Sequence, residues 1–206
     1  MNKKYVVFMV FIWGLASAYV GAVLMARHEI AFQPTESVLA RTKNFGKEVL
    51  QQENSHAGNA LSGGHGIAKP YIAIHLLDER CTCSQAVIED IVNSTIPDAA
   101  PMVLMLSALK DETRARLEGK GIKVRELKSK EAREQFGLET VPWFVVLDRD
   151  LNVLYRGGYS QTKVRSRADL QIGEIMTAIR AQRKPASLPT FGCVTSNELR
   201  SLLLQF

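Results

Sequence analysis

Two cysteines, Cys81 and Cys83, stand one residue apart in the run Arg80-Cys-Thr-Cys-Ser84. They follow an apolar run over residues 70–77 and precede a helix-like segment over residues 84–92. A helix N-terminus carries partial positive charge and unpaired N–H groups, so it favours a cysteine thiolate over the thiol. The thiolate is the form that attacks disulfides or binds metal. The pair therefore predicts thiol chemistry, with two small residues of a tight loop as the alternative.

The third cysteine, Cys193, lies far along the chain from this pair. Three cysteines are too few for a disulfide framework. An odd count also leaves at least one thiol unpaired within the chain, which suits exchange chemistry better than structural cross-linking. We expect Cys193 to reach Cys81 or Cys83 as a second resolving thiol. The alternative is a small buried residue.

The composition is that of a folded protein. The chain has 206 residues, 46% hydrophobic and 23% charged, enough for one globular domain and an appendage. The net charge of +5 is spread among many acids, so it does not argue for nucleic acid. No phosphate-binding glycine loop, nucleophilic serine motif or zinc-type Cys/His spacing is present. We expect no nucleic-acid partner, no dedicated metal site and no cofactor besides the cysteines.

Residues 5–26 contain no charged side chain. As a helix they would span roughly 33 Å, the thickness of a hydrocarbon core. A short basic tail, residues 1–4, precedes them, as in an export signal. The sequence therefore predicts a single-pass anchor in the bacterial inner (cytoplasmic) membrane, with the C-terminal domain facing the periplasm. The alternative is a signal peptide cleaved after Ala16-Ser17-Ala18.

Beyond the anchor, residues 27–65 are predicted to form a helix and a linker, and strands and helices then alternate. Strands are predicted over 71–77, 101–106, 122–127, 142–147 and 153–156, and helices over 84–93, 110–119, 130–136 and 166–183. Helices between strands imply parallel pairing, and the tight turn over 148–152 implies one antiparallel hairpin. The fold class is therefore α/β, with a mixed central sheet covered by helices.

Residues 66–183 resemble the thioredoxin-like superfamily. The resemblance is carried by the strand, cysteine pair and helix over 71–92 and by the run Glu139-Thr-Val-Pro-Trp-Phe-Val-Val-Leu-Asp148. It implies a three-layer α/β/α sandwich in which the Val141–Pro142 bond is cis and faces the cysteines. It also implies that the backbone before Pro142 pairs with an extended substrate. Val141, Pro142 and Arg80 are therefore substrate-binding candidates. A trans proline at the start of an edge strand is the alternative.

The sequence departs from the family pattern at the cysteines. Thioredoxins carry Cys-x-x-Cys, whereas a Cys81–Cys83 disulfide would close a smaller, easily reduced ring. We expect Cys81, favoured as thiolate by the adjacent Arg80, to attack and Cys83 to resolve. His75 stands six residues before Cys81, where thioredoxins keep a buried proton-transferring carboxylate. It either relays protons or is a satisfied core histidine.

These features predict a membrane-tethered thiol–disulfide oxidoreductase that acts on extracytoplasmic protein thiols or disulfides. Its catalytic candidates are Cys81, Cys83, His75 and, on a C-terminal extension over 184–206, Cys193. Two alternatives remain open. One is an extracytoplasmic copper carrier, because soft thiolates favour Cu(I). The other is a non-catalytic binding or assembly module with the same fold.

Overall fold

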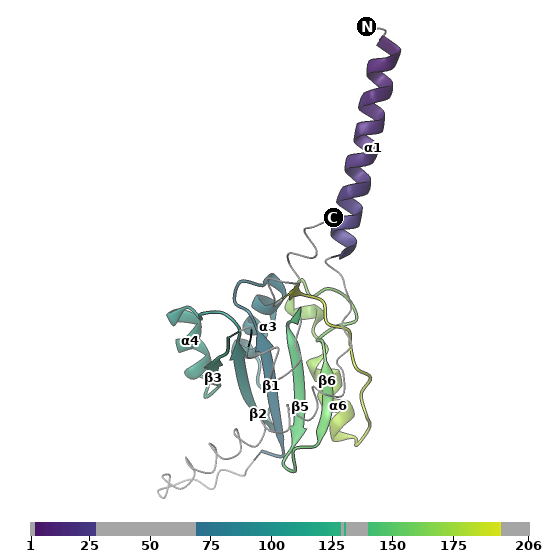
Figure 1. Cartoon of the computed structure of the whole chain (residues 1–206). Coiled ribbons are helices and arrows are strands. Elements are labelled where there is room, and N and C mark those ends of the chain that lie inside the picture. The colour runs from purple at the N-terminus through teal and green to yellow at the C-terminus, as the bar shows by residue number, and fades with distance from the viewer. Residues whose placement is uncertain (1–2, 28–68, 129, 131–139, 195–206) are drawn as a thin grey trace, which may run out of the picture. The chain divides into compact units, whose positions relative to one another are not determined.

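The computed structural model describes residues 3–27, 69–128, 130 and 140–194, which belong to two separate units (Figure 1). The first unit contains helix α1, Lys3–Arg27. Within the described part of the chain, no helix combines the length and hydropathy that a membrane crossing requires. The prediction over residues 5–26 is therefore confirmed as a helix but not as a membrane span. Of the segments predicted over 27–65 and 130–136, residues 28–65 and 131–136 lie outside the described residues.

The second unit contains a five-stranded mixed sheet in the order β3-β2-β1-β5-β6 (Figure 1). The strands are β1, Tyr71–Leu77, β2, Ala99–Met105, β3, Lys123–Glu126, β5, Trp143–Asp148, and β6, Val153–Gly157. Each lies within about two residues of its predicted range. The short β3 occupies an edge of the sheet.

The strand directions correct one prediction. Strand β1 runs parallel to β2, and β2 runs parallel to β3. Strand β5 is antiparallel to both β6 and β1, so the sheet has two antiparallel pairings where the sequence pattern predicted one. A helical connection fixes parallel direction only when it crosses between neighbouring strands. Strands β3 and β5 are not neighbours in the sheet, since β3 pairs with β2 and β5 pairs with β1 and β6.

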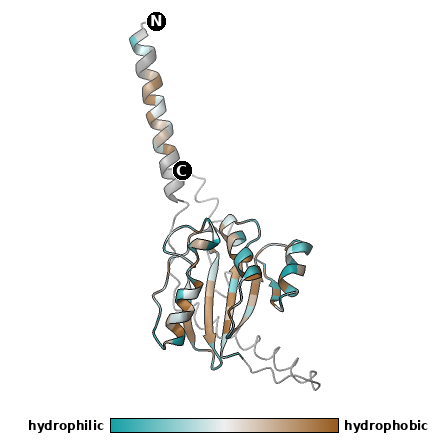
Figure 2. Cartoon of the chain, turned by 180° about the vertical axis from the view of Figure 1, so that it is seen from behind, coloured by the Kyte–Doolittle hydropathy of each residue, from teal (hydrophilic) through white to brown (hydrophobic). Residues whose placement is uncertain are grey.

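The described helices pack on one face of this sheet. They are α3, Thr82–Asn93, α4, Asp111–Glu118, and α6, Ile172–Arg180. Alternation along β1 directs Ala73, His75 and Leu77 to this face, and Ile72, Ile74 and Leu76 to the other, as predicted. Both faces are buried, so the strands are hydrophobic along most of their length (Figure 2).

This mixed sheet with its helices is an α/β architecture, consistent with a thioredoxin-like fold. Among the described residues, no helix contributes to the hydrophobic cluster on the second face of the sheet. The predicted third layer therefore stays a prediction.

The last helix is shorter than predicted. Instead of one helix over 166–183, the chain forms a single 3-10 turn, Arg167–Asp169, and then α6. Ser166 and Asp169 form a capping box on this turn, and Leu170 takes an extended conformation with φ −80° and ψ 125°. These side chains hydrogen-bond the local backbone and so compete with a continuous helix. At the other end, Gln182 has a φ of +54°, which ends the helical conformation.

After α6 the chain returns alongside β6. The Gly158 N–H donates to the Leu188 carbonyl at 2.9 Å, and the Ser187 hydroxyl donates to the Arg156 carbonyl at 2.7 Å. Gly158 allows this approach, because a Cβ there would lie 1.9 Å from the Pro189 carbonyl oxygen. The predicted C-terminal extension is therefore docked on the domain as far as it is described, and its path sets the position of Cys193.

Candidate active site

Cys81 is the N-cap residue of α3, which begins two residues before the predicted helix over 84–93. Its N–H donates to the Asp78 carbonyl at 2.9 Å in the turn that follows β1. Its own carbonyl accepts from the Gln85 N–H at 3.0 Å, which begins the helix. These bonds hold the sulfur at the helix N-terminus. Cys83, two residues further along in α3, is also buried.

The Val141–Pro142 peptide bond is cis, which confirms the prediction. It lies beside Cys81, whose sulfur is 3.8 Å from the Val141 carbonyl oxygen. When protonated, the Cys81 thiol donates a weak hydrogen bond to this oxygen. The two segments implied by the thioredoxin-like resemblance are thus in contact, although they lie sixty residues apart in the sequence.

The C-terminal tail brings the third cysteine to the same place. Strand β7, Cys193–Val194, pairs antiparallel with β4, Thr140–Val141, and Cys193 lies opposite Val141. The approach is so close that a Cβ on Gly192 would lie 1.6 Å from the Val141 carbonyl oxygen. Glycine at position 192 is therefore a steric requirement of this pairing. All three cysteines are free thiols.

The pKa values of the three cysteines are shifted in opposite directions. Hydrogen bonds from the Cys193 and Cys83 thiols lower the pKa of Cys81, against burial, which raises it. The backbone N–H groups of Ser84 and Cys193 lower the Cys81 pKa further, although Cys81 makes no geometric side-chain cap on α3. Donating to Cys81 raises the pKa of both Cys83 and Cys193, and burial adds to this. The cluster therefore favours a thiolate on Cys81 between two protonated thiols.

Arg80 contributes differently from what its sequence position suggested. Its guanidinium bonds both carboxylate oxygens of Asp78, at 3.1 and 2.9 Å, and its side chain is 69% exposed. Burial alone would raise the pKa of Asp78, but the bonds from Arg80 hold it below its usual value. The Cys81 thiolate thus depends mainly on the neighbouring thiols. Our sequence reasoning missed Asp78, although an aspartate two residues before an arginine at a strand end is typical of an Asx turn.

His75 does not bond a cysteine in the described residues. Its ring stacks on Phe144 at a centroid distance of 4.9 Å, and its Nδ1 lies 2.9 Å from the Tyr159 hydroxyl oxygen. Complete burial lowers the pKa of His75 to about 3, so the ring is neutral near neutral pH. This environment argues against a proton relay to the cysteines, but the ring is not a satisfied core histidine either, since its Nε2 has no hydrogen-bond partner among the described residues. Tyr159 was missed too, since nothing in its local sequence marks a partner 84 residues away.

His75 should make folding stability depend on pH. In the unfolded chain the imidazole takes up a proton below its ordinary pKa of 6.5, whereas the folded chain takes it up only near 3. The unfolded state binds more protons in this window, so stability is lost as the pH falls from 6.5 toward 3. Between pH 7 and pH 5 the titration of His75 should lower the free energy of unfolding by about 2 kcal/mol.

The check is urea unfolding of the wild type and His75→Asn at both pH values. The asparagine side chain cannot titrate. Between pH 7 and pH 5 the free energy of unfolding of the variant should therefore fall by about 2 kcal/mol less than that of the wild type. Equal falls in the two proteins would contradict the assignment of a buried neutral histidine.

The described residues contain no group of three or more His, Cys, Asp or Glu side chains placed to hold a metal ion. The Cu(I) alternative therefore has no supporting ligand set in these ranges, and it stays a prediction.

No family model and no curated protein matches the chain. Its fold is similar to an uncharacterized conserved protein from Geobacillus kaustophilus, with a TM-score of 0.50, 18% identity, and 62% of this chain and 77% of that chain covered. A hypothetical protein from Sinorhizobium meliloti has a TM-score of 0.48 and 15% identity, with 62% of this chain and 80% of that chain covered. A thioredoxin-like protein from Aeropyrum pernix has a TM-score of 0.38 and 10% identity, with 80% of this chain and 98% of that chain covered. The first similarity shows a shared fold alone, and the other two are too distant to carry an argument.

Proposed function

We propose that this protein catalyses thiol–disulfide exchange with protein thiols or disulfides, with Cys81 as the attacking thiolate. One observation carries the proposal. The Cys81 sulfur, at the start of α3 and two residues before Cys83, lies 3.8 Å from the carbonyl oxygen of Val141, and Val141 pairs with Cys193 across β4 and β7. A nucleophile and two thiols that could resolve a mixed disulfide thus lie in neighbouring segments of one site. A purely structural role would not require three free cysteines in the segments around one peptide bond.

In the reducing direction, the Cys81 thiolate attacks one sulfur of a partner disulfide. A bond forms between Cys81 and that sulfur, and the other partner sulfur leaves and takes up a proton. A second thiol of this chain then loses its proton and attacks the Cys81 sulfur, which releases the remaining partner thiol. Two thiols here become one disulfide, and the partner disulfide becomes two thiols. The reverse direction uses the same steps, and the reduction potentials determine which one operates.

Access to Cys81 requires the tail to move. Cys81 and Val141 are each only 1% exposed, and β7 occupies the edge of β4 beside them. We propose that an extended partner segment replaces β7 on this edge. Cys193 then leaves with the tail, whereas Cys83 stays in place on α3. Cys83 is therefore the resolving thiol while the partner is bound, and Cys193 closes over Cys81 when the partner leaves.

The same geometry suggests a preferred partner sequence. A segment that docks like β7 brings the residue before its cysteine against the Val141 carbonyl, where only the absence of a side chain at Gly192 avoids collision. We propose that good partners present a cysteine preceded by glycine in an extended segment.

A redox titration tests the proposed function. The reduced full chain is equilibrated in buffers of graded potential, alkylated under denaturing conditions, and weighed to count its thiols. We expect a single two-electron step from three thiols to one, reversible with reductant. Cys83→Ser and Cys193→Ser, as matched single variants, should each keep a step at a different potential. Three thiols that stay reduced at every potential would contradict the proposal and favour the binding-module alternative.

We also propose, from the charge-free run over residues 5–26 alone, that the protein is held at the bacterial inner membrane with its redox domain in the periplasm. Cell fractionation is the test. The full chain should remain in the pellet after alkaline washing, and a variant without residues 1–30 should not. Full release of the intact chain by the wash would contradict the tether.

A further inference from the structure

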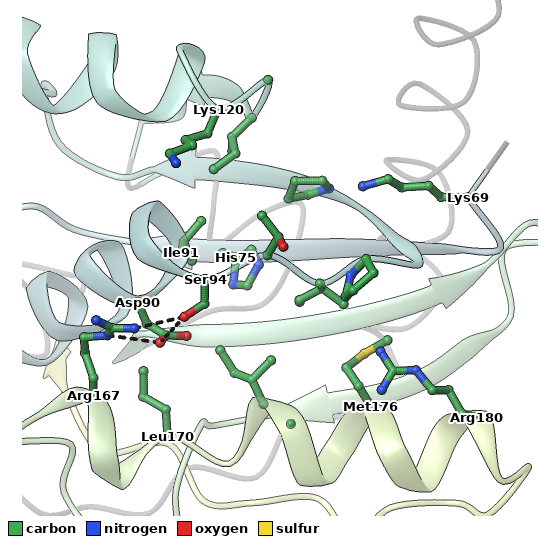
Figure 3. Close-up of a pocket in the computed structure, with 18 residues that line it drawn as sticks. Lys69, His75, Asp90, Ile91, Ser94, Lys120, Arg167, Leu170, Met176 and Arg180 are labelled. Carbon is green, nitrogen blue, oxygen red and sulfur yellow. Dashed lines mark hydrogen bonds and ion pairs between the residues drawn. The ribbon is translucent and has the colours of Figure 1, made fainter. Parts of the chain in front are cut away.

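A cavity of about 440 Å³ lies between α3, α6 and the helix-facing side of the sheet (Figure 3). Its walls include the apolar side chains of Ile91, Ile122, Leu170 and Met176. This volume is in the range of sites that hold small organic molecules. None of the three cysteines lines the cavity, so it is separate from the candidate active site.

His75 is among the residues that line this cavity. The ring is 1% exposed, and its Nε2 is buried and has no hydrogen-bond partner in the part of the chain that the structure describes. The hydrogen bond of the other ring nitrogen, Nδ1, determines whether Nε2 is a donor or an acceptor. The Tyr159 hydroxyl donates to the Trp143 carbonyl at 3.2 Å, so it accepts from His75 Nδ1–H. In the neutral ring, Nε2 is then an acceptor. A buried acceptor without a partner is costly, so a ligand that supplies a donor gains from reaching it.

The cavity wall also carries excess positive charge. Lys69, Lys120, Arg167 and Arg180 line it together with a single carboxylate, that of Asp90 (Figure 3). Arg167 bonds Asp90 at 3.2 Å, and Arg180 bonds Asp98, just outside the lining, at 2.7 Å. These pairs leave the charges of Lys69 and Lys120 in excess, and the Lys69 ammonium group donates to the carbonyl of Ala99.

From these three features we propose that the cavity binds a small, largely apolar organic anion with a hydroxyl or N–H donor at its buried end. The donor bonds His75 Nε2, the apolar body contacts the aliphatic walls, and the anionic group lies near the two lysines. A phenol or arylamine that carries a sulfonate or carboxylate has this chemistry. The site is independent of the proposed redox function, since it uses none of the same residues except His75, which bonds no cysteine.

Anilinonaphthalene sulfonate is a suitable probe, because it combines an N–H donor, aromatic rings and a negative charge. Its fluorescence is titrated against the full-length protein. Gly173 provides a blocking variant, since it lines the cavity and a Cβ there meets no atom within 4 Å. Gly173→Leu should place its side chain in the cavity, and glycine replacement in α6 favours the helix. Gly173→Ala is the matched control.

We expect binding of one probe molecule that Gly173→Leu weakens at least tenfold and that Gly173→Ala changes less than about twofold. His75→Asn, whose amide can keep the bond to Tyr159, should weaken binding about fivefold to tenfold. Phenylnaphthylamine, the same molecule without the sulfonate, should bind more weakly and without dependence on salt. The methyl NMR signal of Met176, identified by its loss in Met176→Leu, should shift when the probe binds.

Unchanged affinity in Gly173→Leu, or a Met176 signal that does not move, would overturn the cavity as the site. Wild-type affinity in His75→Asn would overturn the buried donor. Equal binding of the neutral analogue would overturn the assignment of an anion. Redox titration is unaffected by any of these results, so failure here is distinct from failure of the proposed function.

Discussion

Cys81→Ser is expected to reduce the rate of exchange with a peptide disulfide on the order of a thousandfold or more. The serine hydroxyl stays protonated near neutral pH and is no nucleophile for a disulfide. The remaining thiols are poor substitutes. Donation to Cys81 raises the pKa of both Cys83 and Cys193 most and is lost in this variant, but burial, which also raises both pKa values, remains. The rate is measured with a mixed peptide disulfide whose cysteine follows glycine.

Cys83→Ser is the matched control for this prediction. It retains the Cys81 nucleophile and should still form the mixed disulfide, which then accumulates because its nearest resolving thiol is gone. Mass spectrometry of the quenched reaction detects this adduct on Cys81. A Cys81→Ser protein that keeps more than about a tenth of the wild-type rate would contradict the assignment of the nucleophile.

Gly192→Ala is expected to release the tail from β4 and expose Cys81. The alanine Cβ would overlap the Val141 carbonyl oxygen, so β7 must leave the strand with which it pairs. Alkylation of Cys81 near neutral pH should become at least about tenfold faster, because a residue that is 1% exposed becomes accessible. Loss of the Cys193 donors should raise the pKa of Cys81 at the same time, but access is the larger effect.

The measurement is the rate of iodoacetamide labelling, resolved to each cysteine by peptide mapping. Gly173→Ala again serves as the control, since its added methyl group meets no neighbour. An unchanged Cys81 rate in Gly192→Ala would show that the tail does not cover the site.

Much of the fold could be read from local patterns. The continuous apolar run of β1 and the cysteines after it predicted the strand, the helix that follows it and the facing of His75. The resemblance around Pro142 predicted the cis bond. These features depend on residues close in sequence, where alternation, capping and turn residues are informative.

The rest depended on contacts between distant segments. The antiparallel pairing of β5 with β1 joins strands about seventy residues apart, and no periodicity encodes it. The position of Cys193 follows from Gly192 fitting against Val141, about fifty residues away. The neutral state of His75 follows from Tyr159 and Phe144 on other strands and loops. The Arg80–Asp78 pair was the exception, since it lies within three residues and was readable.

The most direct test of the central claim is the thiolate absorbance of the reduced full chain in the far ultraviolet, followed from about pH 4 to pH 9. Wild type should already carry one thiolate per chain below about pH 7, and Cys81→Ser should lose that signal. Cys83→Ser and Cys193→Ser should each shift its onset to higher pH, because each removes one donor to the Cys81 sulfur. A wild type whose first thiolate forms only near the ordinary cysteine pKa of about 8.5 would contradict a Cys81 thiolate that the neighbouring cysteines stabilise.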